Sequence, residues 1–422
     1  MSGPLAAVPP TLTRRAFLKS AVAATAAGPI ASVCAAADDD ATKPIPVSAV
    51  VTEYRDNSHA DVIVGKILAG FDQKGGPGPG MKLVSLYVDQ FPEHEMSREL
   101  ARKYGFSIAP TIREALTLGT DALQVRGVLS IGEHGKYPFT PRTGQHMYPR
   151  FRFFSEIAET FRACGRVAPV FNDKHLSYSF DEAARMHQTA ADMKIPFMAG
   201  SSLPVTWRKP PLALPIGTQI DEALAIGYGG LESYGFHALE TLQCMVERRA
   251  GGEVGVESVQ AVKGDDIIKA RDRGDWSEAL LAAALQTLPG APPVDLAKLN
   301  PDAAFFLLRY RDGLRATVAM INGLAGEFAF AARLRGEERP AAAWFELQDE
   351  KPFGHFGHLL RAIESMMRSG KPAYPVERTL LTTGVLDEIM QSLADGGARR
   401  KTPRLAIRYA PTDWGFANRD PE

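Results

Sequence analysis

The first half of the chain consists of short apolar runs that alternate with longer mixed segments. The run at residues 47–51 is continuous, as in a strand buried on both faces of a parallel sheet, and further strands are predicted at residues 82–88, 127–131, 167–171 and 197–199. The segments between them are predicted to be helical, at residues 58–70, 96–104, 111–118, 150–164 and 179–195. This order predicts an α/β fold, with a doubly wound parallel Rossmann-like domain at residues 44–204.

Two of these helices begin with a sequence typical of a capping box. Ser58 and Asp61 stand at the first start, and Ser179 and Glu182 stand at the second. We therefore expect each serine side chain to accept a hydrogen bond from the first turn of its helix.

The second half of the chain has a different pattern. Apolar runs at residues 305–310 and 314–320 flank Asp312-Gly313, a two-residue turn that joins antiparallel strands. Two more strands are predicted at residues 329–334 and 342–347, and two helices at residues 356–368 and 376–394. The pattern predicts an α+β domain with an open, largely antiparallel sheet at residues 205–404, followed by a tail at residues 405–422.

The N-terminus has the pattern of an export signal. Arg14-Arg15 is followed by Phe17-Leu18-Lys19 and then by an apolar, alanine-rich stretch. We interpret residues 1–37 as a twin-arginine signal peptide. The twin-arginine export machinery is then a partner of the chain, and the mature protein is expected to be periplasmic or otherwise extracytoplasmic.

Composition restricts the classes of function. Removal of 37 residues from the 422 of the chain leaves enough for two domains. The formal net charge of −1 shows no bias toward nucleic acid, so none is expected as a partner. No apolar run of the mature chain reaches the roughly 18 residues of a membrane span. Only Cys164 and Cys244 follow the signal, which makes a disulfide framework improbable.

Polar and titratable residues gather where the predicted strands end. They are Glu53, Arg55 and His59 after the first strand, Glu133 and His134 after 127–131, Asn172, Asp173, Lys174 and His175 after 167–171, and Ser201 and Ser202 after 197–199. Ligands bind beyond the carboxyl ends of the strands in doubly wound domains. Trp207 and Arg208 come soon afterwards, where they either stack on a sugar or pack the domain junction.

Several segments together resemble one enzyme family. Residues 173–175 and 197–200, the stretch 229–240 that contains His237, the hairpin 309–313 and the helix 356–368 are similar to the glucose-fructose oxidoreductase, inositol dehydrogenase and rhizopine catabolism family (Gfo/Idh/MocA). The resemblance covers almost the whole mature chain. It implies a small carbohydrate substrate, an NAD(P) cofactor and a homo-oligomer formed through the second sheet.

The resemblance also implies residue roles. Lys174 would position and polarise the reacting carbon, and His237 would act as acid or base. Asp173 stands where the family has Glu and His175 where it has Pro, so both belong to the candidate catalytic set. Ser233 stands in the place of an acidic residue that precedes the histidine by four positions.

The largest departure from the family lies in the cofactor turn. The three glycine positions of G-x-G-x-x-G are held by Val51, Glu53 and Asp56. A Cβ at the second position obstructs the approach of a pyrophosphate, and an unpaired carboxylate there repels it. Binding of a dinucleotide in the usual pose should therefore be weakened or lost.

Other residues favour a cofactor on the same side of the site. Asp89 ends the second strand, where an acidic residue binds ribose, and Arg55 offers a charge to phosphate. With Glu53, Glu133 and His134 they form the candidate cofactor-binding set. Histidines and carboxylates of this kind are also metal ligands, but the chain has no short-spacing metal motif, so no metal site is assigned.

Three functions are consistent with these observations. The first, which we adopt as the expectation, is an exported oxidoreductase that acts on a sugar or sugar derivative with a divergent NAD(P) site. The second is a lyase, hydratase or epimerase that uses acid-base or metal chemistry on a carbohydrate without the nucleotide. The third is a carbohydrate-binding protein, which would not need so many ionisable groups in one cleft.

Overall fold

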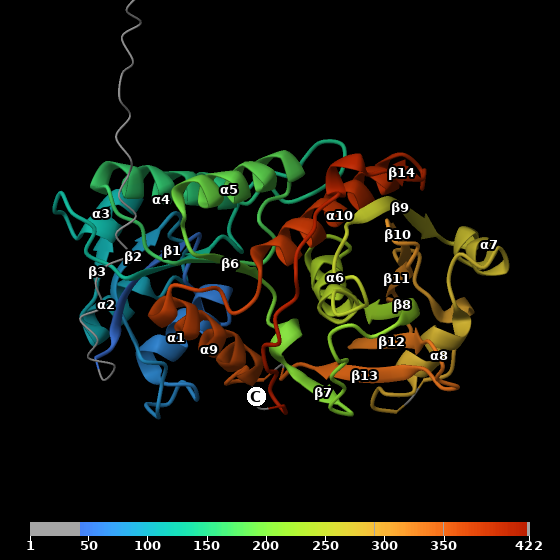
Figure 1. The fold of residues 1–422 in the computed structure, drawn as a ribbon. Coiled ribbons are helices and arrows are strands. Elements are labelled where there is room, and N and C mark those ends of the chain that lie inside the picture. The colour runs from blue at the N-terminus through green and yellow to red at the C-terminus, as the bar shows by residue number, and fades with distance from the viewer. Residues whose placement is uncertain (1–42, 291, 349, 420–422) are drawn as a thin grey trace, which may run out of the picture. The chain divides into compact units, whose positions relative to one another are not determined.

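Two β-sheets organise the described part of the chain (Figure 1). The computed structural model describes residues 43–290, 292–348 and 350–419, so the predicted signal peptide lies outside it. The first sheet has six parallel strands in the order β3-β2-β1-β4-β5-β6. Its strands are β1 (Ile45–Val51), β2 (Met81–Val88), β3 (Ser107–Ala109), β4 (Gly127–Ile131), β5 (Val170–Asp173) and β6 (Phe197–Gly200).

Helices cover both faces of this sheet. One face packs in a single apolar cluster with α1 (His59–Ala69), α2 (Ser97–Tyr104) and α9 (Gly354–Ser369). The other face packs against α3 (Ile112–Thr117), α4 (Arg150–Cys164) and α5 (Phe180–Met193). The predicted doubly wound, Rossmann-like architecture is confirmed.

One of the two predicted caps forms as expected. Ser58 Oγ accepts a hydrogen bond from the backbone N–H of Asp61. The prediction for Ser179 is wrong, because its side chain makes no capping bond. The Phe180 N–H donates instead to the Asp387 carboxylate at 2.9 Å.

The second sheet has eight strands in the order β14-β9-β10-β11-β8-β12-β13-β7. They are β7 (Trp207–Lys209), β8 (Ile220–Gly227), β9 (Val256–Lys263), β10 (Ala304–Tyr310), β11 (Arg315–Met320), β12 (Phe328–Leu334), β13 (Ala341–Glu346) and β14 (Arg400–Lys401). Neighbours are antiparallel except β8 and β11, so the largely antiparallel sheet is confirmed. The β10–β11 hairpin turns at Asp312-Gly313 as predicted, with Gly313 at φ +89°.

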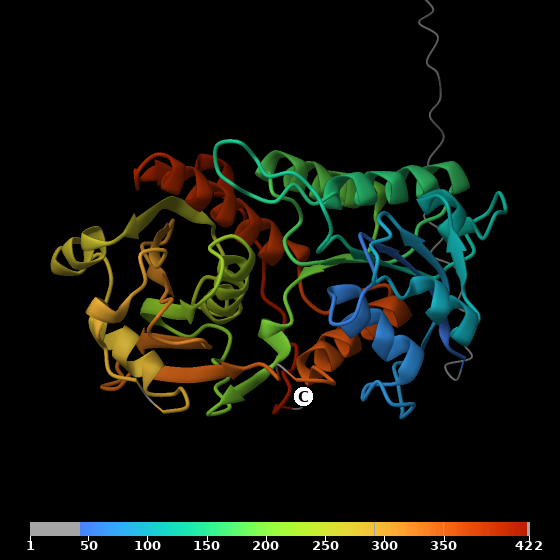
Figure 2. The same cartoon turned by 180° about the vertical axis from the view of Figure 1, so that it is seen from behind.

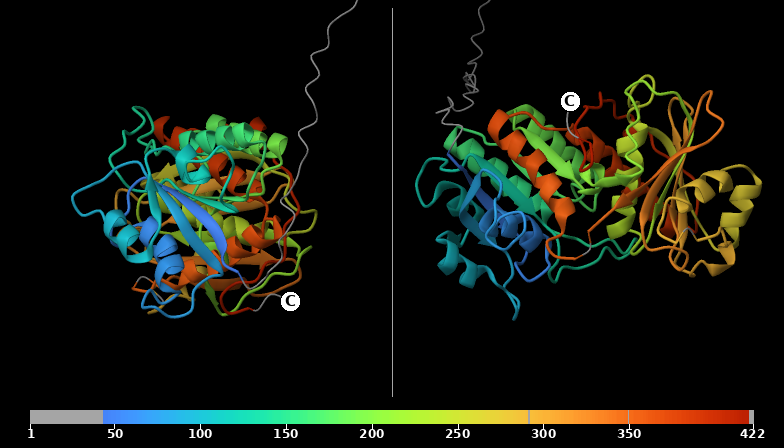
Figure 3. Two further views of the ribbon diagram at one scale, coloured as in Figure 1. Left: turned by 90° about the vertical axis from the view of Figure 1, so that its left-hand side faces the viewer. Right: turned by 90° about the horizontal axis from the view of Figure 1, so that it is seen from below.

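Both faces of the second sheet are apolar and covered. Phe306 of β10 faces a cluster with α6 (Ser233–Val246) and α10 (Val376–Ala394), whereas its neighbour Phe305 faces α7 (Asp265–Asp272) and α8 (Glu278–Leu285). The view from below shows α7 and α8 lying on the side of this sheet away from the first sheet (Figure 3). Three short 3-10 turns complete the described elements, η1 (Leu203–Val205), η2 (Leu296–Lys298) and η3 (Pro403–Leu405).

Helix α9 returns to the first sheet from late in the chain. It falls within the 205–404 range expected for the second domain, yet its fully buried Leu359, Leu360 and Ile363 belong to the cluster that contains Val47 of β1. From behind, α9 is seen beside α1 (Figure 2). In the described ranges, no helix has the length and apolar character needed to cross a membrane.

Candidate active site

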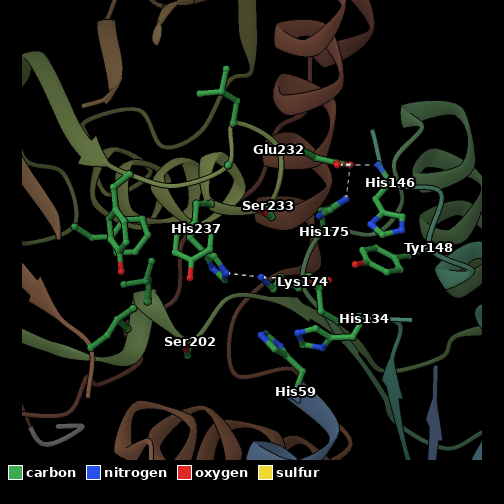
Figure 4. Close-up of a pocket in the computed structure, with 18 of the residues that line it drawn as sticks. His59, His134, His146, Tyr148, Lys174, His175, Ser202, Glu232, Ser233 and His237 are labelled. Carbon is green, nitrogen blue, oxygen red and sulfur yellow. Dashed lines mark hydrogen bonds and ion pairs between the residues drawn. The ribbon is translucent and has the colours of Figure 1, made fainter. Parts of the chain in front are cut away.

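A cavity of about 790 Å³ lies at the carboxyl ends of β4, β5 and β6, where they face the start of α6 (Figure 4). Its volume is within the range of small-molecule sites. Residues from both halves of the chain line it, among them Lys174 from the end of β5 and His237 from α6. The cavity therefore lies where the topology of the first sheet places a ligand.

Lys174 and His237 form the centre of the cavity. Lys174 Nζ lies 2.6 Å from His237 Nε2, and His237 Nδ1 lies 2.6 Å from Ser201 Oγ. Figure 4 shows the two side chains pointing toward one another. Burial, together with the positive charge of Lys174, holds the pKa of His237 well below its usual value. His237 is therefore a neutral imidazole at physiological pH, able to accept a proton.

A buried carboxylate holds the lysine in place. Glu133 follows β4 and lies 3.6 Å from Lys174 Nζ, and it also accepts a hydrogen bond from Arg150 Nη2. Burial alone would raise the pKa of Glu133, but Lys174 and Arg150 outweigh it and keep the pKa well below the usual value. Arg150 is fully buried. Gly132 makes room for it, since a Cβ there would lie 2.7 Å from Arg150 Cγ.

A second carboxyl group lies across the cavity from this centre. Glu232 precedes α6; its Oε2 accepts a hydrogen bond from the His146 N–H at 2.8 Å, and its Oε1 lies 3.9 Å from His175 Nε2 (Figure 4). Burial raises the pKa of Glu232 to about 7. Burial and nearby Arg150 hold the pKa of His175 well below its usual value, so this ring stays neutral. Glu232 can thus exchange a proton near neutral pH.

Asp173 lies outside the cavity and contacts a histidine that lines it. Its carboxylate lies 2.6 Å from Nδ1 of His59, which stands at the start of α1. The His59 ring is 5.5 Å from that of His134, and burial followed by the charge of His59 lowers the pKa of His134 to about 4. Asp173 therefore orients a histidine that lines the cavity.

Backbone strain is concentrated around the cavity. In the described ranges, seven residues other than glycine have a positive φ, and four of them line this site. They are Asn57 at 58°, His134 at 72°, Lys174 at 68° and Phe353 at 51°. Such residues cost stability and are found mostly where function fixes the backbone. The strain is independent support for a functional site here.

The turn between β1 and α1 does not have the shape of a dinucleotide cradle. After Val51 the chain bends at Thr52 and turns at residues 56–57. Gln90 N donates to Thr52 O at 2.8 Å and Met96 N donates to Tyr54 O at 2.7 Å, so two carbonyl groups of this turn are bonded to the segment that follows β2. No tight glycine turn exists at this corner.

Side chains fill the remaining space of that turn. Glu53 is 7% exposed and accepts a hydrogen bond from Arg55 Nε at 2.6 Å. The N–H groups at the start of α1 are also engaged, since Asn57 N donates to Asp61 and Asp61 N donates to Ser58 Oγ. The helix N-terminus therefore offers fewer donors to a phosphate than the cofactor motif requires.

Asp89 is likewise occupied by the protein. Its carboxylate accepts hydrogen bonds from Tyr87 at 2.6 Å, Tyr137 at 2.7 Å and Arg152 at 2.6 Å. Burial raises the pKa of Asp89, but these three bonds outweigh it and the net shift is downward. A ribose hydroxyl would have to share the carboxylate with these three donors. The residues of this chain do not fit a dinucleotide in its customary pose.

The candidate residues predicted from the sequence divide into two groups. Those that line the cavity are Glu133, His134, Lys174, His175 and His237. Those that do not line it are Glu53, Arg55, Asp89 and Asp173. No cluster of three or more metal-ligating side chains occurs within the described ranges. Trp207 packs edge-on against His358, and Arg208 is buried at the junction of the two sheets.

Sequence reasoning missed two residues of this site, Arg150 and Glu232. Arg150 begins a helix whose other buried positions are apolar except for Thr160, so only its place after Tyr148-Pro149 set it apart. Ser233 stands where the family has an acidic residue, and Glu232 directly precedes it. A carboxylate one position away from the family's acidic position was the signal that could have identified Glu232.

No family model matches the sequence, and no curated protein does. Solved structures match at 10–15% identity. GenD2 from gentamicin A biosynthesis, solved with NAD, matches with a TM-score of 0.55 and 13% identity over 85% of this chain and 97% of its own. A putative myo-inositol dehydrogenase from Sinorhizobium meliloti 1021 gives 0.51 and 15%, over 85% and 99%. A probable dehydrogenase from Thermotoga maritima gives 0.52 and 13%, over 86% and 100%.

The fold is that of the Gfo/Idh/MocA-type dehydrogenases. The resemblance predicted from residues 173–175 and 229–240 is thereby confirmed at the level of architecture. Sequence identities this low show that the Gfo/Idh/MocA fold is shared. They do not show that residues at matching positions have the same roles.

We expect Glu232→Gln to change how stability depends on pH. A folded-state pKa of about 7 means that the native protein keeps a proton that the unfolded chain has lost, so stability falls as pH rises from about 4.3 through 7. Gln cannot titrate, so thermal unfolding between about pH 5 and pH 7.5 should show a shallower decline than wild type.

Glu240 provides the matched control, because burial raises its pKa to about 7 as well. Glu240→Gln should remove a similar part of the slope, and the double variant should remove both parts. An unchanged slope in Glu232→Gln would show that Glu232 is ionised across this range.

We expect NAD and NADP to bind the wild-type protein more weakly than about 1 mM, as measured by calorimetry. Glu53→Gly should not restore tight binding, because the bonds of Asp89 to Tyr137 and Arg152 remain. A crystal in which NADP crosses the β1–α1 turn in the customary orientation would contradict this reading.

Proposed function

We propose that the protein is an enzyme that acts on a sugar or sugar derivative and transfers a proton through Lys174 and His237. The observation that carries this proposal is the 2.6 Å contact between Lys174 Nζ and His237 Nε2 in the wall of the cavity. A neutral imidazole beside an ammonium group can accept a proton from a substrate hydroxyl or C–H. The ammonium then stabilises the negative charge that develops on the substrate.

Aromatic rings on two sides of the cavity support a carbohydrate substrate. Phe139, His146 and Tyr148 form one continuous stack, with ring centroids 4.3 and 4.0 Å apart. On the other side Tyr234 stacks on Phe328. Phe139 is 60% and Tyr234 38% exposed, although large apolar side chains are usually buried. Such surfaces pack against the apolar faces of a sugar ring, while the ionisable groups bind its hydroxyls.

Two reaction classes use the same proton transfer. An exported oxidoreductase with a divergent NAD(P) site is supported by the fold shared with dehydrogenases. A lyase, hydratase or epimerase is supported by Glu232 and by the filled cofactor turn. The geometry of the site favours the second class, because that class needs an acid and a base and needs no nucleotide. A carbohydrate-binding protein would not require this strained, ionisable centre.

In the favoured reaction two groups move protons. Once the Lys174 ammonium that occupies His237 Nε2 has turned to the substrate, this nitrogen accepts the proton of a substrate C–H that a neighbouring carbonyl has made acidic, and Lys174 stabilises the resulting anion. Glu232, which is largely protonated below its pKa of about 7, gives its proton to the departing hydroxyl. Water leaves and a double bond forms between the two carbons. Readdition of a proton to the opposite face of the anion would give epimerisation instead.

Export and assembly are part of the proposal. The Arg14-Arg15 segment supports export through the twin-arginine pathway, and fractionation of cells expressing the full chain should place the mature protein outside the cytoplasm.

A homo-oligomer is proposed by analogy with the family. Because α7 and α8 cover one face of the second sheet, its interface would have to include these helices or a sheet edge. Light scattering during gel filtration measures the assembly.

We expect Lys174→Met to lower turnover about 10²- to 10⁴-fold. The assay incubates the protein with monosaccharides, uronic acids and inositols in deuterated water, and proton NMR records exchange of substrate C–H positions. Exchange without added nucleotide indicates acid-base chemistry, whereas turnover only with NAD(P) indicates an oxidoreductase. Lys263→Met removes an exposed lysine outside the cavity and should leave the rate unchanged.

Loss of exchange in Lys174→Met with an unchanged unfolding midpoint would support the proposed role of the lysine. Equal rates in the wild type and Lys174→Met would refute it. Sugar binding without turnover under any condition would leave the carbohydrate-binding protein.

A further inference from the structure

A second, much smaller cavity lies at the junction of the two sheets. Its volume is about 20 Å³, which is room for a single water-sized particle. The chain after η1, the end of α6, the start of α10 and the C-terminal tail contribute its walls. None of its lining residues lines the cavity that contains Lys174 and His237.

Three buried guanidinium groups line this small cavity, and two of them have carboxylate partners. Arg378 donates two hydrogen bonds to Glu247, at 2.9 and 2.6 Å. Arg248 donates to Asp413 at 2.6 Å. The positive charges of these two arginines are therefore balanced.

The third guanidinium, that of Arg208, has no carboxylate partner among the described residues. It is 6% exposed and donates to the carbonyl oxygens of Pro204 and Leu212, both at 3.0 Å. The rings of Phe345 and Phe416 pack on its faces. Burial and the neighbouring arginines lower the pKa of Arg208 to about 10, so it is still charged at neutral pH. An uncompensated buried charge of this kind is strongly unfavourable.

Three hydrogen-bond donors of this cavity have no partner. Arg208 Nε, Arg378 Nη1 and the Tyr374 hydroxyl are all buried, and each belongs to a residue that lines the cavity. Buried donors are rarely left unpaired in folded proteins. A water molecule could accept hydrogen bonds from the two arginines and donate one to the Tyr374 hydroxyl, but it brings no charge, so it cannot balance Arg208.

We propose that this cavity binds one small monovalent anion of the size of chloride, held by Arg208, Arg378 and Tyr374. The anion balances the charge of Arg208 and accepts hydrogen bonds from the three unpaired donors. It also ties together four segments that are distant in sequence. The ligand is a structural halide, and its site is independent of the proposed reaction.

The direct test is anomalous diffraction from crystals of the wild-type protein grown in sodium bromide. We expect a bromide peak between Arg208 and Arg378. Absence of the peak, with both side chains placed as described, would overturn the proposal. This measurement needs no variant, so it stands even if substitutions of Arg208 fail to fold.

Solution stability provides the second test. At constant ionic strength, replacing sodium gluconate by sodium chloride should raise the unfolding midpoint by about 3 °C, because gluconate is too large for the cavity. Arg208→Met should abolish this shift. Arg335→Met, which removes an exposed arginine elsewhere, should retain it. A bromide peak without any halide-dependent shift would indicate an adventitious ion only and would overturn the proposal.

The chain's own last residues are the competing source of negative charge, since Asp420 and Glu422 follow the tail that packs on Arg208. The double variant Asp420→Asn, Glu422→Gln distinguishes the two sources without placing a new carboxylate on Arg419, which lines the cavity. We expect it to keep the wild-type chloride shift. A wild type insensitive to chloride, together with a double variant that becomes sensitive, would show that these two side-chain carboxylates fill the site.

Discussion

The arrangement of the active site depends on one buried charge cluster. Glu133 carries the negative charge for two cations, Arg150 and Lys174, at the end of the parallel sheet. Without it two positive groups would be left uncompensated away from water, at a cost of about 3–5 kcal/mol. Glu133 therefore fixes the ammonium of Lys174, and that ammonium fixes the position of His237. Burial and then the charge of Lys174 lower the pKa of His237 and keep the ring neutral. Arg150 Nη1 lies 3.0 Å from His175 Nε2, so the position of His175 depends on the same cluster.

The altered β1–α1 turn belongs to the same cluster. Thr52, the first residue after β1, donates from its hydroxyl to the backbone carbonyl of Glu133 at 2.5 Å. The Thr52 side chain thus supports the loop that carries the central carboxylate. It links the turn after β1 to the residue that holds Lys174.

The sequence predicted those features whose cause is local. Continuous apolar runs located β1, β4 and β6, and Asp312-Gly313 located the hairpin, because buried strands and tight turns depend on neighbouring residues. Three-residue β3 was too short to show a pattern. The Ser179 cap failed because its role is taken by Asp387, 207 residues away. Lys174 and His237 were predicted from strand ends and family resemblance, and both line the cavity. Arg150 was missed because its buried partners, Glu133 and His175, come from two different strand ends.

The placement of α9 has a consequence for how the polypeptide acquires its structure. Helix α9, which packs on the same face of the first sheet as α1, is synthesised about 150 residues after β6. This face of the sheet is therefore covered completely only after most of the second half has been made. Until then the apolar side chains of this cluster lack the part of their cover that α9 provides. Late closure of this kind slows maturation and favours transient association with chaperones. Residues 44–204 made alone would therefore expose to water the apolar surface that α9 covers in the full chain.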